Sequence, residues 1–248
     1  MMNIYHITYS PSPKVVCLHF WGCNLNCRAC LLKKEIYDCH LKETKDAIFD
    51  PEKIAPSAPD RFLTLDEVMD AVRGLKKVRY VILMGAEASL DPGLPNLVKL
   101  LHEEFNSHNI LLTNGMKMIS LRDIDEVVFS IKALNDRLHR DYTGKSNRQA
   151  LKNFVSMHKL GIKMNAESIL IPEYIDFDEI ERIARFIGGI DKNIPYRIDA
   201  YLPVQNNPWR RPGRDEIMMA VKRAGKYLKN VSFIAGDEKL TFGSIRIV

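Results

Sequence analysis

Two kinds of segment alternate along most of the chain. Short apolar runs, typical of buried strands, are each followed by a longer stretch in which apolar residues recur every three or four positions, as in an amphipathic helix. The predicted strands are 15–21, 80–84, 110–113, 127–131, 163–169 and 196–200. The predicted helices are 65–75, 94–105, 147–159, 177–187 and 215–228. Thr64, with Glu67 three residues on, predicts a capping box before the first of these helices.

Alternating strands and helices predict an α/β fold, in which a parallel sheet is covered by helices. About six such units fit either a doubly wound open sheet or a partial or complete β/α barrel, and local patterning does not separate these folds. No internal repeat or domain boundary is evident. We therefore predict a single domain over residues 1–248.

Composition and charge narrow the class of protein. The chain is 46% hydrophobic and 27% charged, as in ordinary globular proteins. No apolar run is long enough to cross a bilayer, and residues 1–9 do not resemble a cleavable signal peptide, so we expect a cytoplasmic protein without a membrane partner. The net charge of +5 predicts a generally basic surface, and a nucleic-acid partner is not expected. The basic residues gather only at Arg210, Arg211 and Arg214.

All the cysteines fall in the first 39 residues. An odd number crowded into one segment of a cytosolic-looking chain favours metal ligation over disulfides. Cys17 lies in an alternating apolar run, so we interpret it as a core residue, although it could also close a zinc site. The five cysteines are Cys17, Cys23, Cys27, Cys30 and Cys39.

Three of these cysteines form the core signal. Cys23, Cys27 and Cys30 directly follow the first predicted strand with the spacing C-x3-C-x2-C. Three thiolates can hold three corners of a cubane iron-sulfur cluster and leave the fourth iron open for chemistry. Clusters used only for electron transfer and structural zinc sites are normally closed by a fourth protein ligand. A zinc site closed by Cys39 or His40 remains the alternative.

At this point the sequence resembles a known family. The cysteine spacing is similar to the cluster motif of the radical S-adenosylmethionine (radical SAM) superfamily, and three further segments follow in the order of that family. Residues 84–92 resemble its Gly-Gly-Glu-Pro segment, residues 112–115 its Thr-Asn-Gly, and residues 130–144 the fourth-strand region of the activating enzymes for pyruvate formate-lyase and other glycyl radical enzymes. The resemblance implies a partial (β/α)6 TIM-like barrel, with a 4Fe-4S cluster and S-adenosylmethionine at the C-terminal ends of the strands.

The resemblance also implies roles for individual residues. Cys23, Cys27 and Cys30 would bind the cluster, and Lys132 would be catalytic as well as bind the cofactor. Ala29 stands where the activating enzymes usually carry an aromatic residue, so adenine would pack differently. The predicted S-adenosylmethionine contacts are Ala29, Gly85, Glu87, Thr113, Asn114, Ser130, Lys132, Asn165 and Asp199.

The predicted function is that of a radical SAM oxidoreductase of the activating-enzyme type. It would cleave S-adenosylmethionine reductively and abstract hydrogen from a protein substrate, with reduced ferredoxin or flavodoxin as electron donor and Arg210 to Arg214 helping the substrate to dock. An alternative is a radical enzyme acting on a small molecule, similar to carboxydeazaguanine synthase. An alternative of another class is a non-catalytic iron-sulfur or zinc-binding interaction module.

Overall fold

Nine strands form one sheet in the computed structural model of the chain, which describes residues 1–33, 41, 58–204, 206–238 and 243–248. The strand order is β8-β7-β6-β5-β4-β3-β2-β1-β9. Strands β2 to β8 run parallel to one another, and β1 pairs antiparallel with both β2 and β9. The strands are β1 (Ile4–Ser10), β2 (Val15–Phe20), β3 (Tyr80–Gly85), β4 (His108–Thr113), β5 (Glu126–Ser130), β6 (Lys163–Leu170), β7 (Tyr196–Ala200), β8 (Val231–Ile234) and β9 (Ile245–Arg246).

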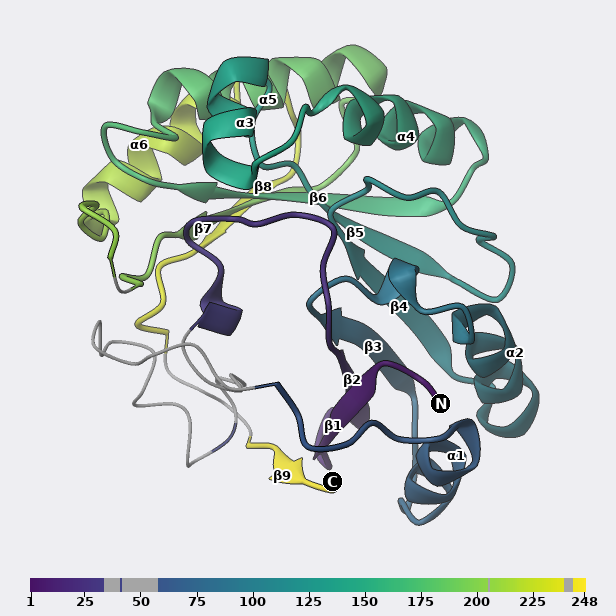
Figure 1. The fold of residues 1–248 in the computed structure, drawn as a ribbon. Helices are drawn as coiled ribbons and strands as arrows, with labels where there is room; N and C mark the ends of the chain where they lie inside the picture. The colour runs from purple at the N-terminus through teal and green to yellow at the C-terminus, as the bar shows by residue number, and fades with distance from the viewer. Residues whose placement is uncertain (34–40, 42–57, 205, 239–242) are drawn as a thin grey trace.

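The α-helices cover the outer face of the curved sheet (Figure 1). The α-helices are α1 (Leu65–Arg73), α2 (Leu94–Phe105), α3 (Asp136–Thr143), α4 (Arg148–Lys159), α5 (Phe177–Ile190) and α6 (Arg214–Ala224), and two 3-10 helices are η1 (Leu31–Lys33) and η3 (Ala88–Leu90). A doubly wound sheet would carry helices on both faces. The arrangement with one covered face confirms the barrel-like alternative of the sequence prediction.

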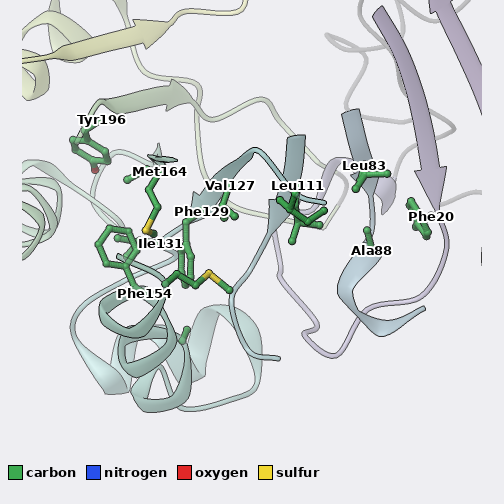
Figure 2. Close-up of a cluster of buried hydrophobic side chains, with 14 of the residues drawn as sticks. Phe20, Leu83, Ala88, Leu111, Val127, Phe129, Ile131, Phe154, Met164 and Tyr196 are labelled. Carbon is green, nitrogen blue, oxygen red and sulfur yellow. The ribbon is translucent and has the colours of Figure 1, made fainter. Parts of the chain in front are cut away.

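The hydrophobic core lies between the sheet and the helices. In the parallel strands β2 to β7, alternate residues are buried on the helix side, and Figure 2 shows such residues meeting side chains from the helices, for example Phe129 against Phe154. The two rings meet edge to face at 5.0 Å between centroids. The same alternation directs the other side chains of each strand toward the inside of the arc.

All six predicted strands and five predicted helices are present, with bounds that differ by a few residues. The capping box is confirmed, because the Thr64 hydroxyl accepts from the Glu67 amide at 3.2 Å and the Thr64 amide donates to the Glu67 carboxylate at 2.8 Å. The sheet is an open, partial barrel, since β8 and β9 at its two ends do not pair with each other in the described residues. The strands β1, β8 and β9 and the helix α3 were not predicted.

No helix in the described part of the chain combines the length and apolar character that crossing a membrane requires. Cys39 and His40, the residues proposed to close a zinc site, lie outside the described residues. The arginines of the predicted docking segment are engaged within the chain. Arg210 forms two contacts with Glu216, at 2.7 and 2.8 Å, and Arg214 lies 3.5 Å from Asp237.

Candidate functional site

The ends of the parallel strands gather the predicted site residues at one rim of the sheet. Inward positions near the C-terminal ends of β5, β6 and β7 are polar, and those of β2 to β4 lead into the loops that carry the sequence motifs. Barrel enzymes carry their active sites at this end of the strands. We call residues 22–30, 85–87 and 113–115 the motif wall. We call Ser130, Lys132, Glu167, Arg197 and Asp199 the charged wall.

The cysteine loop begins at the end of β2, where the end of β3 holds it. The Ala86 amide donates to the Phe20 carbonyl at 2.8 Å, and the Glu87 amide donates to the Gly22 carbonyl at 3.1 Å. Gly85 makes this approach possible. Its φ is +99°, and a Cβ atom there would lie 2.6 Å from the Phe20 carbonyl oxygen. Two of the family-like motifs are thus joined by backbone hydrogen bonds.

The middle of the cysteine loop is tied to α3. The amides of Asn26 and Arg28 donate to the carbonyls of Thr143 and Tyr142, each at 2.9 Å. These carbonyls belong to the last turn of the helix, where carbonyl groups lack an intrahelical partner. The loop therefore caps the helix, and the helix fixes the loop backbone.

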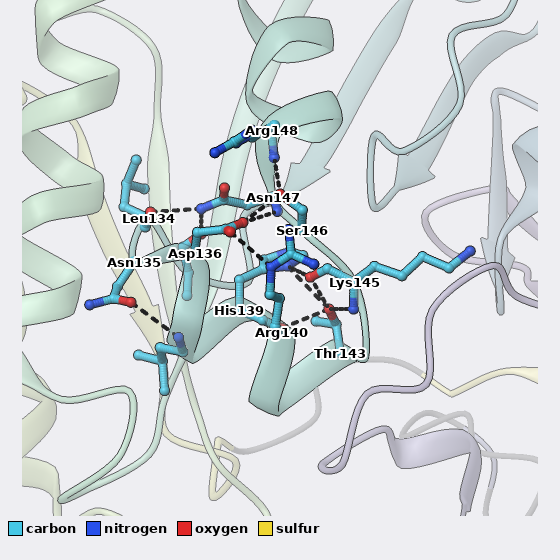
Figure 3. Close-up of polar contacts among 12 residues, drawn as sticks. Leu134, Asn135, Asp136, His139, Arg140, Thr143, Lys145, Ser146, Asn147 and Arg148 are labelled. Carbon is cyan, nitrogen blue, oxygen red and sulfur yellow. Dashed lines mark hydrogen bonds and ion pairs between the residues drawn. The ribbon is translucent and has the colours of Figure 1, made fainter.

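Helix α3 is held in turn by its own polar contacts (Figure 3). Asn135 caps its first turn, and the Asp136 carboxylate accepts from the Asn147 amide at 3.0 Å. The Nδ1 atom of His139 lies 2.6 Å from the Lys145 carbonyl. These contacts fasten both ends of the helix to the segment that leads into α4, so the cysteine loop rests on a well-supported element.

Glu87 lies at the centre of the motif wall. It is almost fully buried and accepts hydrogen bonds from the Thr113 hydroxyl at 2.7 Å, the Ser89 hydroxyl at 2.5 Å and the Asn114 amide at 2.8 Å. Hydrogen-bond donors, not a cation, therefore compensate this carboxylate. Its Oε2 atom accepts one of these bonds and has capacity for a second donor.

Asn114 connects the third motif to the cysteine loop. Its side-chain amide donates to the Asn24 side chain at 2.8 Å and lies 3.5 Å from the Cys23 sulfur. The Cys23 sulfur also accepts from the Leu25 amide at 3.4 Å. The predicted residues Glu87, Thr113 and Asn114 thus form one hydrogen-bonded unit that reaches the first cysteine.

The charged wall is organised around Arg197. Its guanidinium donates to Glu167 at 2.6 Å and to both oxygens of Asp199, at 2.7 and 2.9 Å, while the Ser130 hydroxyl donates to the other oxygen of Glu167. Burial raises the pKa of Asp199, and the neighbouring guanidinium only partly opposes this shift. Two acidic groups share this arginine, which relieves part of their mutual repulsion, and the charge of Lys132 also acts on both of them.

Lys132 interacts electrostatically with both walls. Burial by itself would lower the pKa of its ammonium group, but Cys27, Glu167, Cys30 and Cys23 together raise the pKa above its usual value. The group is therefore protonated at neutral pH. One cation thus acts on all three cysteines of the loop.

The donor set fits an iron-sulfur cluster. Within the described ranges, no three Cys, His, Asp or Glu side chains converge closely enough to hold one ion, and a cubane cluster spaces its thiolate ligands more widely than an ion does. Among the described residues, the Tyr5 hydroxyl is buried and has no hydrogen-bond partner. Burial, followed by the charge of Cys30, raises its pKa to about 12. An unpartnered donor near the loop suits the sulfur atoms of a cluster.

Not every predicted residue lies at the rim. Asn165 lies two residues before Glu167 in β6, on the same face of the strand but further from the C-terminal rim. Its side chain donates to Glu126. Ala29 is buried among core side chains. Their predicted contacts with the cofactor stay predictions.

Several residues around the site carried no sequence signal of their role. Asp141, Tyr174, Asn207 and Trp209 all contact Arg28 of the cysteine loop, although as many as 181 positions separate the partners in the chain. Only the three-dimensional fold brings them together, because no local motif encodes such distant contacts.

Comparison with known proteins agrees with this geometry. The sequence profile of the Radical SAM superfamily matches residues 18–187. A curated protein of Methanocaldococcus jannaschii, whose name assigns it provisionally to the glycyl-radical enzyme activating enzymes, is 29% identical over 243 residues, which cover 94% of this chain and 84% of that protein.

Two solved structures share the fold. A domain of the pyruvate-formate lyase-activating enzyme of Bacteroides vulgatus is 15% identical, with a TM-score of 0.52, over 62% of this chain and 97% of that domain. Streptococcus suis SuiB bound to S-adenosylmethionine is 15% identical, with a TM-score of 0.62, over 85% of this chain and 47% of SuiB. With its profile match extending over the motif wall and most of the parallel sheet, the chain belongs to the radical SAM superfamily.

Proposed function

We propose that Cys23, Cys27 and Cys30 hold a 4Fe-4S cluster and that the protein acts as an activating enzyme on a protein substrate. When bound, the cluster supplies the electron that splits S-adenosylmethionine into methionine and a 5'-deoxyadenosyl radical. That radical takes a hydrogen atom from the substrate and becomes 5'-deoxyadenosine. The observation that carries the proposal is the joining of three family-like motifs into one hydrogen-bonded wall around the cysteine loop.

The residues of the two walls would divide the binding of S-adenosylmethionine. We assign its ammonium to the free acceptor position of Glu87 and its carboxylate to Lys132 and Ser130. Thr113 and Asn114 would orient Glu87, since both already donate to it. Gly85 would leave room for the ligand beside the backbone.

The remaining cofactor contacts are assigned more broadly. Asp199 and Asn165, on the inner faces of β7 and β6, would contact the cofactor, and Ala29 would lie beside the adenine. Reduced ferredoxin or flavodoxin would supply the electron. These assignments follow the family resemblance, and the polar character of the inner strand faces supports them.

The experiment that tests this function is anaerobic reconstitution with iron and sulfide, followed by reduction with dithionite in the presence of S-adenosylmethionine. We expect 5'-deoxyadenosine from the wild type and none from Cys27→Ala, with chromatography as the readout. A wild-type protein that binds one zinc ion per chain and makes no 5'-deoxyadenosine would contradict the proposal and favour the interaction-module alternative.

A small polar substrate is the second candidate, and the charged wall favours it, because an arginine and two carboxylates face the inside of the arc. The two candidates differ in what raises the yield of 5'-deoxyadenosine. Deuterium transfer into 5'-deoxyadenosine from a labelled glycyl radical enzyme would support the activating role. Transfer only from labelled small molecules would support the alternative.

A further inference from the structure

Arg28 lies in the cysteine loop and contacts distant parts of the chain through both its side chain and its backbone, although it is not among the predicted ligands. The Nη1 atom of its guanidinium lies 2.9 Å from the Asp141 carboxylate. The guanidinium carbon lies 4.6 Å from the centre of the Trp209 ring and 5.6 Å from that of the Tyr174 ring. Both distances are within the range of cation–π attraction.

The groups that hold Arg28 also hold one another. The Tyr174 and Trp209 rings stack with 4.2 Å between centroids and 26° between planes, and the Tyr174 hydroxyl donates to Asp141. Trp209 further meets Tyr142 and Tyr201, at 6.4 and 5.9 Å between ring centroids. The guanidinium therefore docks onto a preassembled aromatic and acidic surface.

The backbone of Arg28 is held as completely as its side chain. Its amide donates to the Tyr142 carbonyl at 2.9 Å, and its carbonyl accepts from the Asn207 side chain at 2.9 Å. The contacts come from three separate segments, which are the end of α3, the loop after β6 and the segment after β7. All three segments contact Arg28, which lies with Ala29 between Cys27 and Cys30.

We propose that Arg28 is the positioning residue of the cysteine loop. Asp141, Tyr174, Asn207 and Trp209 form a clamp that orders the backbone between the second and third cysteines before a cluster binds. The inference rests on the proposed function and deepens it. Ordering a loop in advance spares metal binding the loss of chain entropy, and groups behind the ligands of metal sites typically change affinity about 10- to 100-fold.

The chemistry of the clamp requires an arginine. A planar guanidinium can pair with a carboxylate and cover an aromatic face at the same time, whereas a lysine ammonium is a compact, strongly hydrated charge. We therefore expect Arg28→Lys to keep the charge and lose most of the ordering. Trp209→Phe keeps an aromatic face for the guanidinium and should retain most of the ordering of the loop.

Two measurements test the clamp. In the cluster-free protein, hydrogen exchange should be slow at the amides of Asn26 and Arg28 and faster in Arg28→Ala and Trp209→Ala. In the reconstituted protein, the same variants should release iron to a chelator about tenfold faster than the wild type. Trp209→Phe should restore both readouts to within about threefold, which loss of general stability alone would not predict.

Arg185→Ala is the matched control, because Arg185 covers the Tyr227 ring at 5.2 Å on the outer helices, away from the cysteine loop. It should leave both readouts unchanged. If Trp209→Ala does not fold, Arg28→Lys and Asp141→Asn decide by the same measurements, since both alter partly exposed side chains.

The failure of the clamp and the failure of the proposed function are distinguishable. A wild type that assembles a cluster, with Arg28→Ala and Trp209→Ala holding iron and protecting their amides equally well, would overturn the clamp alone. A wild type that takes up no cluster under reconstitution would instead overturn the proposed function.

Discussion

The motif wall and the charged wall lie at the same rim of the sheet but are built in different ways. In the motif wall, backbone groups and short polar side chains satisfy one another, and even the buried Glu87 is held by hydrogen-bond donors. In the charged wall, long side chains from β6 and β7 balance their charges around Arg197. The stability of the motif wall therefore depends on close packing and backbone conformation, whereas that of the charged wall depends on balanced charges.

This difference predicts two kinds of failure. A change that adds bulk to the motif wall should destabilise the protein through steric overlap. Because such a change removes no charged partner, the loss should vary little with pH. A change that unbalances the charged wall should cost less on acidification, when carboxylates can take up protons. The variants below separate these behaviours by their effect on the free energy of unfolding.

Gly85→Ala should have the largest effect, a loss of about 3 kcal/mol that varies little with pH. The new Cβ atom would overlap the Phe20 backbone at 2.6 Å on a residue with φ +99°. Urea denaturation at pH 5.5 and 7.5 measures the loss. The overlap would also displace the start of the cysteine loop, so cluster uptake should fall.

Gly161→Ala is the control that separates the cost of a positive φ from the cost of steric overlap with a neighbouring strand. Gly161 has a similar φ of +76°, but an added Cβ atom would meet nothing within 4 Å. We expect a loss of about 1 kcal/mol from the left-handed conformation alone. Equal losses in the two variants would mean that the close approach of β2 and β3 is not needed.

Arg197→Leu should have the next largest effect, a loss of about 2 kcal/mol at pH 7.5, less than for a fully buried pair because the side chains retain some exposure. The variant removes the guanidinium that bridges Glu167 and Asp199, and Lys132 remains as the other cation that acts on both carboxylates. Since burial already raises the pKa of Asp199, removal of the arginine should raise it further. Protonation then relieves the repulsion, so the loss should shrink as the pH falls. A loss of equal size at pH 5.5 and 7.5 would contradict charge balance as its cause.

Glu87→Gln tests the motif wall for dependence on charge. The hydroxyls of Thr113 and Ser89 can turn to accept from a glutamine amide, while its carbonyl accepts from the Asn114 amide. We therefore expect a loss of only about 1 kcal/mol in stability. Binding of S-adenosylmethionine, measured by calorimetry on the reconstituted protein, should weaken about tenfold, because the ammonium loses a charged partner. Unchanged binding would remove Glu87 from the proposed cofactor contacts.

The difference between the walls also explains what the sequence could predict. The motif wall was predicted because each of its parts is a short contiguous segment that resembles a family motif and lies at the end of a predicted strand. For the charged wall, alternation placed Arg197 and Asp199 on one strand face, but the pairing of Arg197 with Glu167 depends on the register between β6 and β7. No local pattern carries that register.

The sequence did not predict α3 and β9 for similar reasons. The eight residues of α3 are strongly polar, and much of the helix's support comes from contacts outside it, as Figure 3 shows. The strand β9 has only two residues, which pair with Thr8 and Tyr9 of β1. The clamp around Arg28 was invisible in the sequence, because its aromatic partners look like ordinary packing residues.

Lys163→Met should have the smallest effect and shows where charge balance stops mattering. The Lys163 ammonium lies 2.6 Å from Glu126, on the face shared with the charged wall, but 65% of the lysine side chain is exposed. Water can replace this partner, and the Asn165 side chain still donates to the same carboxylate. We expect a loss of about 0.5 kcal/mol in urea denaturation. A loss as large as that of Arg197→Leu would mean that the whole inner face of β5 to β7, and not only its rim, depends on paired charges.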